Sequence, residues 1–122
     1  MVSMDLSTSG DGRAVVAWRG ELDVADAAGV AAALAAVAGR GPAIIVDLGG
    51  LEFIDSSGVA ALVLVRKQAR RAGGDLLLAA PQQQVLRFLT ITRLVDVFSV
   101  HASVEQAAGS AGRSRLAAVA VP

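Results

Sequence analysis

The sequence contains no cysteine and only one histidine, His101. Disulfides, thiolate metal sites and a cysteine nucleophile are therefore excluded, and so is a metal site built from several histidines. Aromatic residues make up 3% of the chain, so the stacking platforms of nucleic-acid-binding proteins are nearly absent. The 11 basic and 11 acidic residues cancel to a net charge of zero. No long-range field attracts nucleic acid or an anionic membrane, and a partner must be recognised by local surface.

Long apolar runs are also missing. No run approaches the ~20 residues that span a bilayer, and residues 1–11 lack the basic and apolar pattern of a signal peptide. We therefore expect a cytoplasmic protein without a cofactor. Hydrophobic residues form 54% of the 122 residues and charged residues 18%, which is the composition of a folded chain. This length predicts a single domain, over residues 1–110, followed by a flexible tail over residues 111–122.

Strand and helix patterns alternate along the chain, punctuated by glycine and proline. The first two strands flank the turn signal at residues 9–12, which predicts a hairpin, and Gly49-Gly50 is expected to be a turn. The order predicts an α/β fold, a mixed β-sheet with an N-terminal β-hairpin and about four α-helices. Strands are expected near residues 2–7 and at Arg13–Arg19, Ala43–Leu48, Asp75–Ala80 and Val97–Val100, and helices at Val24–Ala38, at Val59–Ala72, from Pro81 as first residue to about Leu89, and at Ser103–Ala108.

The segment Asp55-Ser56-Ser57-Gly58 stands directly before a helical pattern. Aspartate and serine are preferred N-cap residues, each stabilising a helix by about 1 kcal/mol, and Asp23 precedes an earlier helix in the same way. Phosphate-binding glycine loops and the G-x-S-x-G turn of serine hydrolases are absent. Capping explains the two aspartates without an acid–base role, so we do not expect an enzyme.

The helix after Ser57 has an unusual exposed face. With Ser56 at 0° and about 100° per residue, Leu62, Val65 and Ala69 define a buried face near 200°. The remaining face predicts an exposed apolar stripe with a basic end, headed by Ser56. Exposed apolar side chains beside an accessible serine favour a binding surface over an enzyme pocket. The residues on this face are Val59, Ala60, Val63, Lys67, Arg70 and Arg71.

A family resemblance rests on these residues. The chain is similar to STAS domains, in particular the free-standing anti-sigma factor antagonists, from about residue 3 to residue 108. The segment F-I-D-S-S-G, residues 53–58, is specific among these motifs, whereas G-E-L-D alone would be weak. The family often has Thr-Gly-Leu where this chain has Thr92-Arg93-Leu94, which implies an arginine in a left-handed position. The matching segments are Gly20-Glu21-Leu22-Asp23, Val46-Asp47-Leu48, Leu51 to Val59, Gly73-Gly74 and Pro81.

The resemblance implies a phosphorylation switch at Ser56. In that family an anti-sigma factor that is also a serine kinase binds the unphosphorylated antagonist, the sigma factor is freed, and a serine phosphatase reverses the phosphorylation. Asp23 and Asp55 match positions bordering the site, and Ser57 is the alternative phosphorylation site. The residues we expect at the partner surface are Asp23, Asp55, Ser56, Ser57, Val59, Ala60, Val63 and Lys67.

Two other functions remain open at this point. STAS-like domains also serve transporters, so the chain is alternatively an accessory subunit of a transport ATPase. It is also alternatively a small-ligand or nucleotide sensor that uses the loops at the strand ends, although the usual phosphate cradle is missing. Co-purification with an ATPase instead of a kinase, or heat on titration with nucleotides, would select one of these two functions.

Overall fold

The computed structural model describes residues 2–10, 13–38 and 43–110. The tail predicted for residues 111–122 lies outside these residues. Within the described part, the chain forms five strands, four α-helices and a short 3-10 helix. In chain order they are β1 (Val2–Thr8), β2 (Ala14–Leu22), α1 (Val24–Ala38), β3 (Ala43–Ile54), α2 (Ser56–Arg71), β4 (Asp75–Ala79), α3 (Gln83–Ile91), η1 (Leu94–Asp96), β5 (Ser99–His101) and α4 (Val104–Ser110).

The five strands form one mixed sheet in the order β1-β2-β3-β4-β5. β1 pairs with β2 in an antiparallel hairpin, and all later pairs are parallel. Each parallel pair is joined by a helical connection, as the sequence pattern required. The predicted α/β fold with an N-terminal hairpin and a mixed sheet is therefore confirmed.

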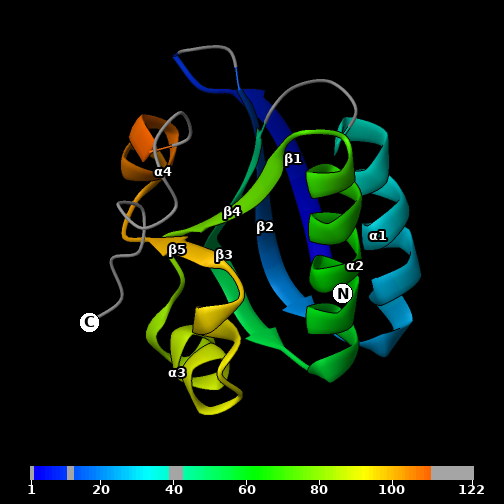
Figure 1. Ribbon diagram of the computed structural model, residues 1–122. Coiled ribbons are helices and arrows are strands. Elements are labelled where there is room, and N and C mark those ends of the chain that lie inside the picture. Colours follow the sequence, from blue (N-terminus) through cyan, green and yellow to red (C-terminus); the bar gives the residue numbers. More distant parts are fainter. Residues whose placement is uncertain (1, 11–12, 39–42, 111–122) are drawn as a thin grey trace.

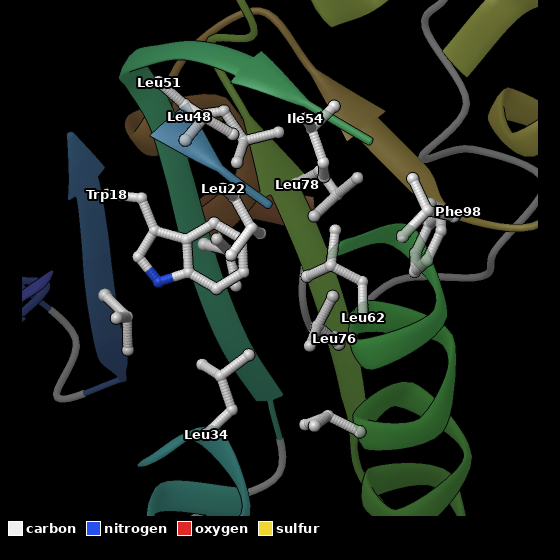
Figure 2. Close-up of a cluster of buried hydrophobic side chains, with 14 of the residues drawn as sticks. Trp18, Leu22, Leu34, Leu48, Leu51, Ile54, Leu62, Leu76, Leu78 and Phe98 are labelled. Carbon is white, nitrogen blue, oxygen red and sulfur yellow. The ribbon is translucent and has the colours of Figure 1, made fainter. Parts of the chain in front are cut away.

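Helices α1 and α2 lie side by side on one face of the sheet, and α4 lies on the other face (Figure 1). The larger core lies between the sheet and α1 and α2, and it includes Trp18 of β2, Leu34 of α1 and Leu62 of α2 (Figure 2). Val85 and Leu89 of α3 belong to the same cluster. A smaller cluster, with Ile45, Leu77 and Ala107, lies beneath α4. Val, Leu, Ile and Ala thus fill a core that holds few aromatic rings.

The third strand is longer than predicted, because Gly49-Gly50 continues β3 instead of ending it. The pairing of β2 with β3 shifts register between Ala17 and Arg19, which are opposite Asp47 and Gly50. A β-carbon at Gly50 would lie 2.9 Å from the Trp18 carbonyl oxygen, too close for any other residue. The glycines therefore allow a bulge in the pairing, not a turn.

The segment between β4 and β5 also differs from the prediction. Pro81 is not the first residue of α3, which begins at Gln83 with Gln82 at its N-cap. The short helix η1 was not predicted. Its N-cap Arg93 has φ of 61°, so the expected left-handed arginine is present. A side chain there costs about 1–2 kcal/mol compared with an unstrained conformation.

Candidate functional site

Asp55 fixes the start of α2. Its Oδ1 accepts a hydrogen bond from the Gly58 backbone N–H at 3.0 Å, and its carbonyl oxygen accepts one from the Val59 N–H at 3.1 Å. Its backbone is extended, as an N-cap requires. Ser56 is thus the first helical residue, and its side chain is exposed. The predicted position of Ser56 at the mouth of a helix is confirmed.

Asp23 has the same role at the start of α1. Its Oδ1 accepts a hydrogen bond from the Ala25 backbone N–H at 3.0 Å. The two helix starts are linked because the Asp55 N–H donates to the Leu22 carbonyl oxygen at 3.3 Å. Asp23 and Asp55 therefore follow the ends of two neighbouring parallel strands, β2 and β3, at one edge of the sheet. The structure brings these two predicted site residues to the same end of the molecule.

A close contact sets how α2 leaves the sheet. A β-carbon at Gly58 would lie 2.8 Å from Leu22 Cγ and 2.9 Å from Ile54 Cγ1. Real β-carbons essentially never approach so closely, so the first turn of α2 rests on the strand ends only because residue 58 has no side chain. This packing holds the backbone beneath Ser56, while Ser57 next to it is half-buried.

The predicted exposure of Val59 is wrong. Its side chain is only 6% exposed and belongs to the main core cluster. The helical wheel set a single buried face from the spacing of Leu62, Val65 and Ala69, and it placed Val59 about 100° away from the centre of that face. In the structure α1 lies beside α2 on the same face of the sheet (Figure 1), and Phe98, just after η1, belongs to the same buried cluster as Val59 and Leu62. The buried arc of α2 is therefore wider at its beginning than the helical wheel predicted.

The other residues of the predicted stripe divide into two groups. Ala60 and Lys67 are exposed, together with Arg70 and Arg71 at the end of the helix. Val63 is half-buried and packs against the core. The exposed apolar part of α2 is therefore smaller on this side than the sequence predicted.

The sequence reasoning missed Leu64, whose side chain is 50% exposed. At about 80° from Ser56, it lies well outside the buried face, and the helical wheel contained enough information to find it. Phe53, near the end of β3, is 49% exposed and was also missed. An alternating strand pattern would not identify Phe53, because the bulge in β3 changes which side chains face outward.

Two further acidic residues lie near the ends of β2 and β3, the strands that precede the capped starts of α1 and α2. Glu21 lies opposite Phe53 in the pairing of β2 with β3, and Glu21 and Glu52 are both exposed. With Asp23 and Asp55 they place four acidic residues near the strand ends at which α1 and α2 begin. At the other end of α2, Arg66 and Arg70 lie 3.7 and 3.4 Å from oxygens of Asp75. The first turn of α2 has no acidic residue, so the negative charge at its start comes from residues that precede the helix, whereas its last turn is basic.

Neither a metal site nor a membrane-spanning helix is found in the described part of the chain. Within residues 2–10, 13–38 and 43–110, no group of three or more His, Asp or Glu side chains is placed to hold a metal ion. Among the helices described, none combines the length and the apolar character that crossing a bilayer demands. His101, the sole histidine, is buried in β5, and burial lowers its pKa from 6.5.

Comparisons with solved structures place the fold among known proteins. An anti-sigma factor antagonist from Mycobacterium paratuberculosis is 24% identical, with a TM-score of 0.81, over 93% of this chain and 96% of that one. Unphosphorylated SpoIIAA, an anti-sigma factor antagonist, is 21% identical, with a TM-score of 0.73, over 98% of this chain and 100% of that one. An anti-sigma-factor antagonist (STAS) domain protein from Planctomyces limnophilus is 17% identical, with a TM-score of 0.71, over 90% and 98%. At these identities the similarity shows a shared fold.

A comparison of sequences with family models supports the same assignment. No curated protein sequence matches this chain. The family model of the STAS domain matches residues 6–107, which is most of the chain and includes the strand ends and both capped helix starts described above. The chain therefore belongs to the STAS domain family.

Proposed function

We propose that this chain is an anti-sigma factor antagonist controlled by phosphorylation of Ser56. In its unphosphorylated form it binds an anti-sigma factor, and a sigma factor is released. The anti-sigma factor acts as a serine kinase: it transfers the γ-phosphoryl group of ATP to the Ser56 hydroxyl, which loses its proton, and ADP leaves. A serine phosphatase restores the binding form. We place this cycle in the cytoplasm, and the chain acts in it as a binding partner and not as an enzyme.

One observation carries the proposal: Ser56 is exposed, while the neighbouring Asp55 caps the helix. Because the Ser56 side chain is not the N-cap, its modification leaves the hydrogen bond from Gly58 to Asp55 in place. A phosphate at the first helical position can also accept hydrogen bonds from the N–H groups that have no acceptor within the helix. The fold therefore tolerates the modification that the partner must detect. SpoIIAA, which shares the fold, is known in unphosphorylated and phosphorylated forms.

The phosphate acts on the partner through charge. It adds about −1.5 to −2 charges to a surface that Asp23 and Asp55 already make acidic. A partner that covers this surface must remove water from the dianion, and burying an unpaired charge costs several kcal/mol. Since 1.4 kcal/mol is about a tenfold change in affinity, phosphorylation reduces binding by orders of magnitude. No large change of shape is needed.

The proposed partner surface surrounds Ser56. It comprises the two capping aspartates, the two serines and the outward residues of α2. Val59 supports this surface from beneath, because its buried side chain cannot contact a partner directly. The residues that we propose at the contact are Asp23, Asp55, Ser56, Ser57, Ala60, Val63 and Lys67.

The test compares three forms of the chain with each anti-sigma factor kinase encoded by the source genome. We expect the unmodified protein to bind the cognate kinase before ATP is added, Ser56→Ala to bind it with and without ATP, and Ser56→Asp to bind it weakly. Loss of binding in the unmodified form after incubation with ATP, but not in Ser56→Ala, identifies the switch. Equal affinities of Ser56→Ala and Ser56→Asp would contradict the proposal.

Mass spectrometry distinguishes Ser56 from Ser57. Trypsin releases residues 41–66 as one peptide, because no lysine or arginine lies between Gly41 and Arg66. Fragmentation of this peptide after incubation with kinase and ATP assigns the phosphate. We expect it on Ser56, since Ser57 is half-buried. Two results would contradict the proposed function. Co-purification with a transport ATPase would indicate an accessory subunit of that ATPase, and heat on titration with a nucleotide would indicate a nucleotide sensor.

A further inference from the structure

Five of the exposed residues of α2 form a continuous stripe along the whole helix. We call Ser56, Ala60, Leu64, Lys67 and Arg71 the α2 stripe. All five side chains are exposed. Their spacing of four, four, three and four residues keeps them within an arc of about 80°, since successive residues are about 100° apart. The stripe begins with the serine, continues with two apolar residues and ends with two cations.

The two cations of the stripe differ from the other two cations of α2. Arg66 and Arg70 form a cluster with Asp75, at 3.7 and 3.4 Å. Within the described part of the chain, neither Lys67 nor Arg71 has an ion-pair partner. Asp75 therefore pairs with two of the four cations of α2, and the positive charges of Lys67 and Arg71 remain available to a partner.

We propose that the partner lies lengthwise along the α2 stripe and presents acidic side chains to Lys67 and Arg71. The inference rests on the proposed function and specifies the partner's chemistry. Leu64 is 50% exposed, between the serine and the cations, and a partner that covers it excludes water from the middle of the stripe. The neighbouring cations then lose part of their hydration, which is unfavourable unless carboxylates compensate it. Charge complementarity therefore favours an acidic protein surface over a neutral one.

The charge pattern also fixes the orientation of the partner. The start of α2 is flanked by Asp23 and Asp55, whereas its end carries Lys67 and Arg71. A partner placed in the reverse direction would bring its acidic side chains to the acidic start of the helix. Such like-charge contacts disfavour the wrong arrangement, so the stripe specifies direction as well as affinity.

The serine and the cations act independently. At 1.5 Å per residue, Lys67 lies about 16 Å and Arg71 about 22 Å along the helix axis from Ser56. Both distances exceed the Debye length of about 8 Å at physiological ionic strength, so a phosphate on Ser56 does not neutralise these cations. Perturbations at such separated sites add in free energy. Phosphorylation thus removes binding at one end of the stripe, while the cations at the other end select the partner.

The test measures binding of the cognate anti-sigma factor kinase to Lys67→Glu and to Arg71→Glu. We expect each variant to weaken binding about 3- to 10-fold at 0.05 M salt, mainly through slower association, and less than twofold at 0.5 M salt. The control is Arg19→Glu, which changes net charge equally on an exposed residue of β2; its neighbour Trp18 faces the core beneath α1 and α2, so alternation along the strand directs Arg19 to the other face. It should stay within about twofold of the parent chain. Fluorescence of Trp18, the only tryptophan, verifies folding of every variant.

Combination with the serine variant separates the two proposals. In the double variant Ser56→Asp/Lys67→Glu, we expect the loss of affinity to equal the product of the losses in the two single variants. Should Ser56→Asp weaken binding while Lys67→Glu and Arg71→Glu bind like the parent chain, the lengthwise contact is refuted and the proposed function stands. Should no anti-sigma factor bind any form, the proposed function falls, and this inference falls with it.

Other occupants of the α2 stripe give distinct results. Binding to vesicles of phosphatidylglycerol and phosphatidylethanolamine, lost in Lys67→Glu and Arg71→Glu, would assign the stripe to a lipid surface. A concentration-dependent dimer in sedimentation experiments, lost in the same variants, would assign it to a second copy of the chain. Either result would overturn the proposal.

Discussion

The close packing at Gly58 predicts opposite effects for two glycine-to-alanine substitutions. Gly58 lies in the first turn of α2, where a new β-carbon would lie 2.8 Å from Leu22 Cγ and 2.9 Å from Ile54 Cγ1. Gly29 lies inside α1, and a β-carbon there meets nothing within 4 Å. Both substitutions remove a residue of low helix propensity, so the difference between them isolates the cost of the contact.

The magnitudes follow from these contacts. Replacing an interior helical glycine by alanine gains up to about 1 kcal/mol, so we expect Gly29→Ala to raise the free energy of unfolding by about 0.5–1 kcal/mol. Overpacking costs about 1–3 kcal/mol, which the gain in propensity offsets in part at Gly58. We therefore expect Gly58→Ala to lower the free energy of unfolding by about 1–2 kcal/mol. The midpoint of thermal unfolding should fall by several degrees.

The assay is denaturant unfolding followed by fluorescence. Trp18 is the only tryptophan and is fully buried in the core, so its emission reports loss of packing directly. Equal slopes of the unfolding curves make the midpoints comparable. If Gly58→Ala is as stable as Gly29→Ala, the contact with Leu22 and Ile54 does not constrain the start of α2, and our account of how Ser56 is positioned is refuted.

Three further predictions concern the cap, the left-handed arginine and the buried histidine. Asp55→Ala should lower the free energy of unfolding by about 1 kcal/mol while Asp55→Asn largely preserves it, because the lost interaction is the hydrogen bond from the Gly58 N–H; equal losses in urea unfolding would contradict this. Arg93→Gly should raise the free energy of unfolding by up to about 1 kcal/mol, because glycine adopts a φ of 61° without strain, whereas Arg93→Ala should leave it unchanged. Thermal unfolding of both variants tests this prediction. Burial lowers the pKa of His101 from 6.5, so the unfolded chain binds a proton more readily than the folded chain. The contribution of neutral His101 to the free energy of unfolding is therefore complete above pH 6.5, and it is lost as the pH falls through 6.5 towards the lowered pKa. Urea midpoints at pH 7.5 and 5.5 test this, and His101→Gln should show a smaller change.

The fold and the position of Ser56 at a helix start could be predicted because the capping residues and the spacing of apolar residues indicated the same helices and strands. Aspartate before serine, followed by helical periodicity, placed Ser56 at a helix start, and the alternation of strands and helices gave the mixed sheet. The predicted exposure of Val59 failed because a helical wheel contains no information about which other elements, such as α1, pack beside the helix. The turn predicted at Gly49-Gly50 failed because glycine signals a close backbone approach as readily as a turn, and only the pairing with β2 distinguishes the two.

The division of roles between Asp55 and Ser56 has an evolutionary consequence. Since the aspartate secures the helix, the neighbouring serine is free to vary with little cost to folding. Under the proposed function, one codon change to alanine creates a permanently active antagonist, and one change back restores control. Lineages can therefore lose or regain regulation at this position without first having to rebuild the scaffold.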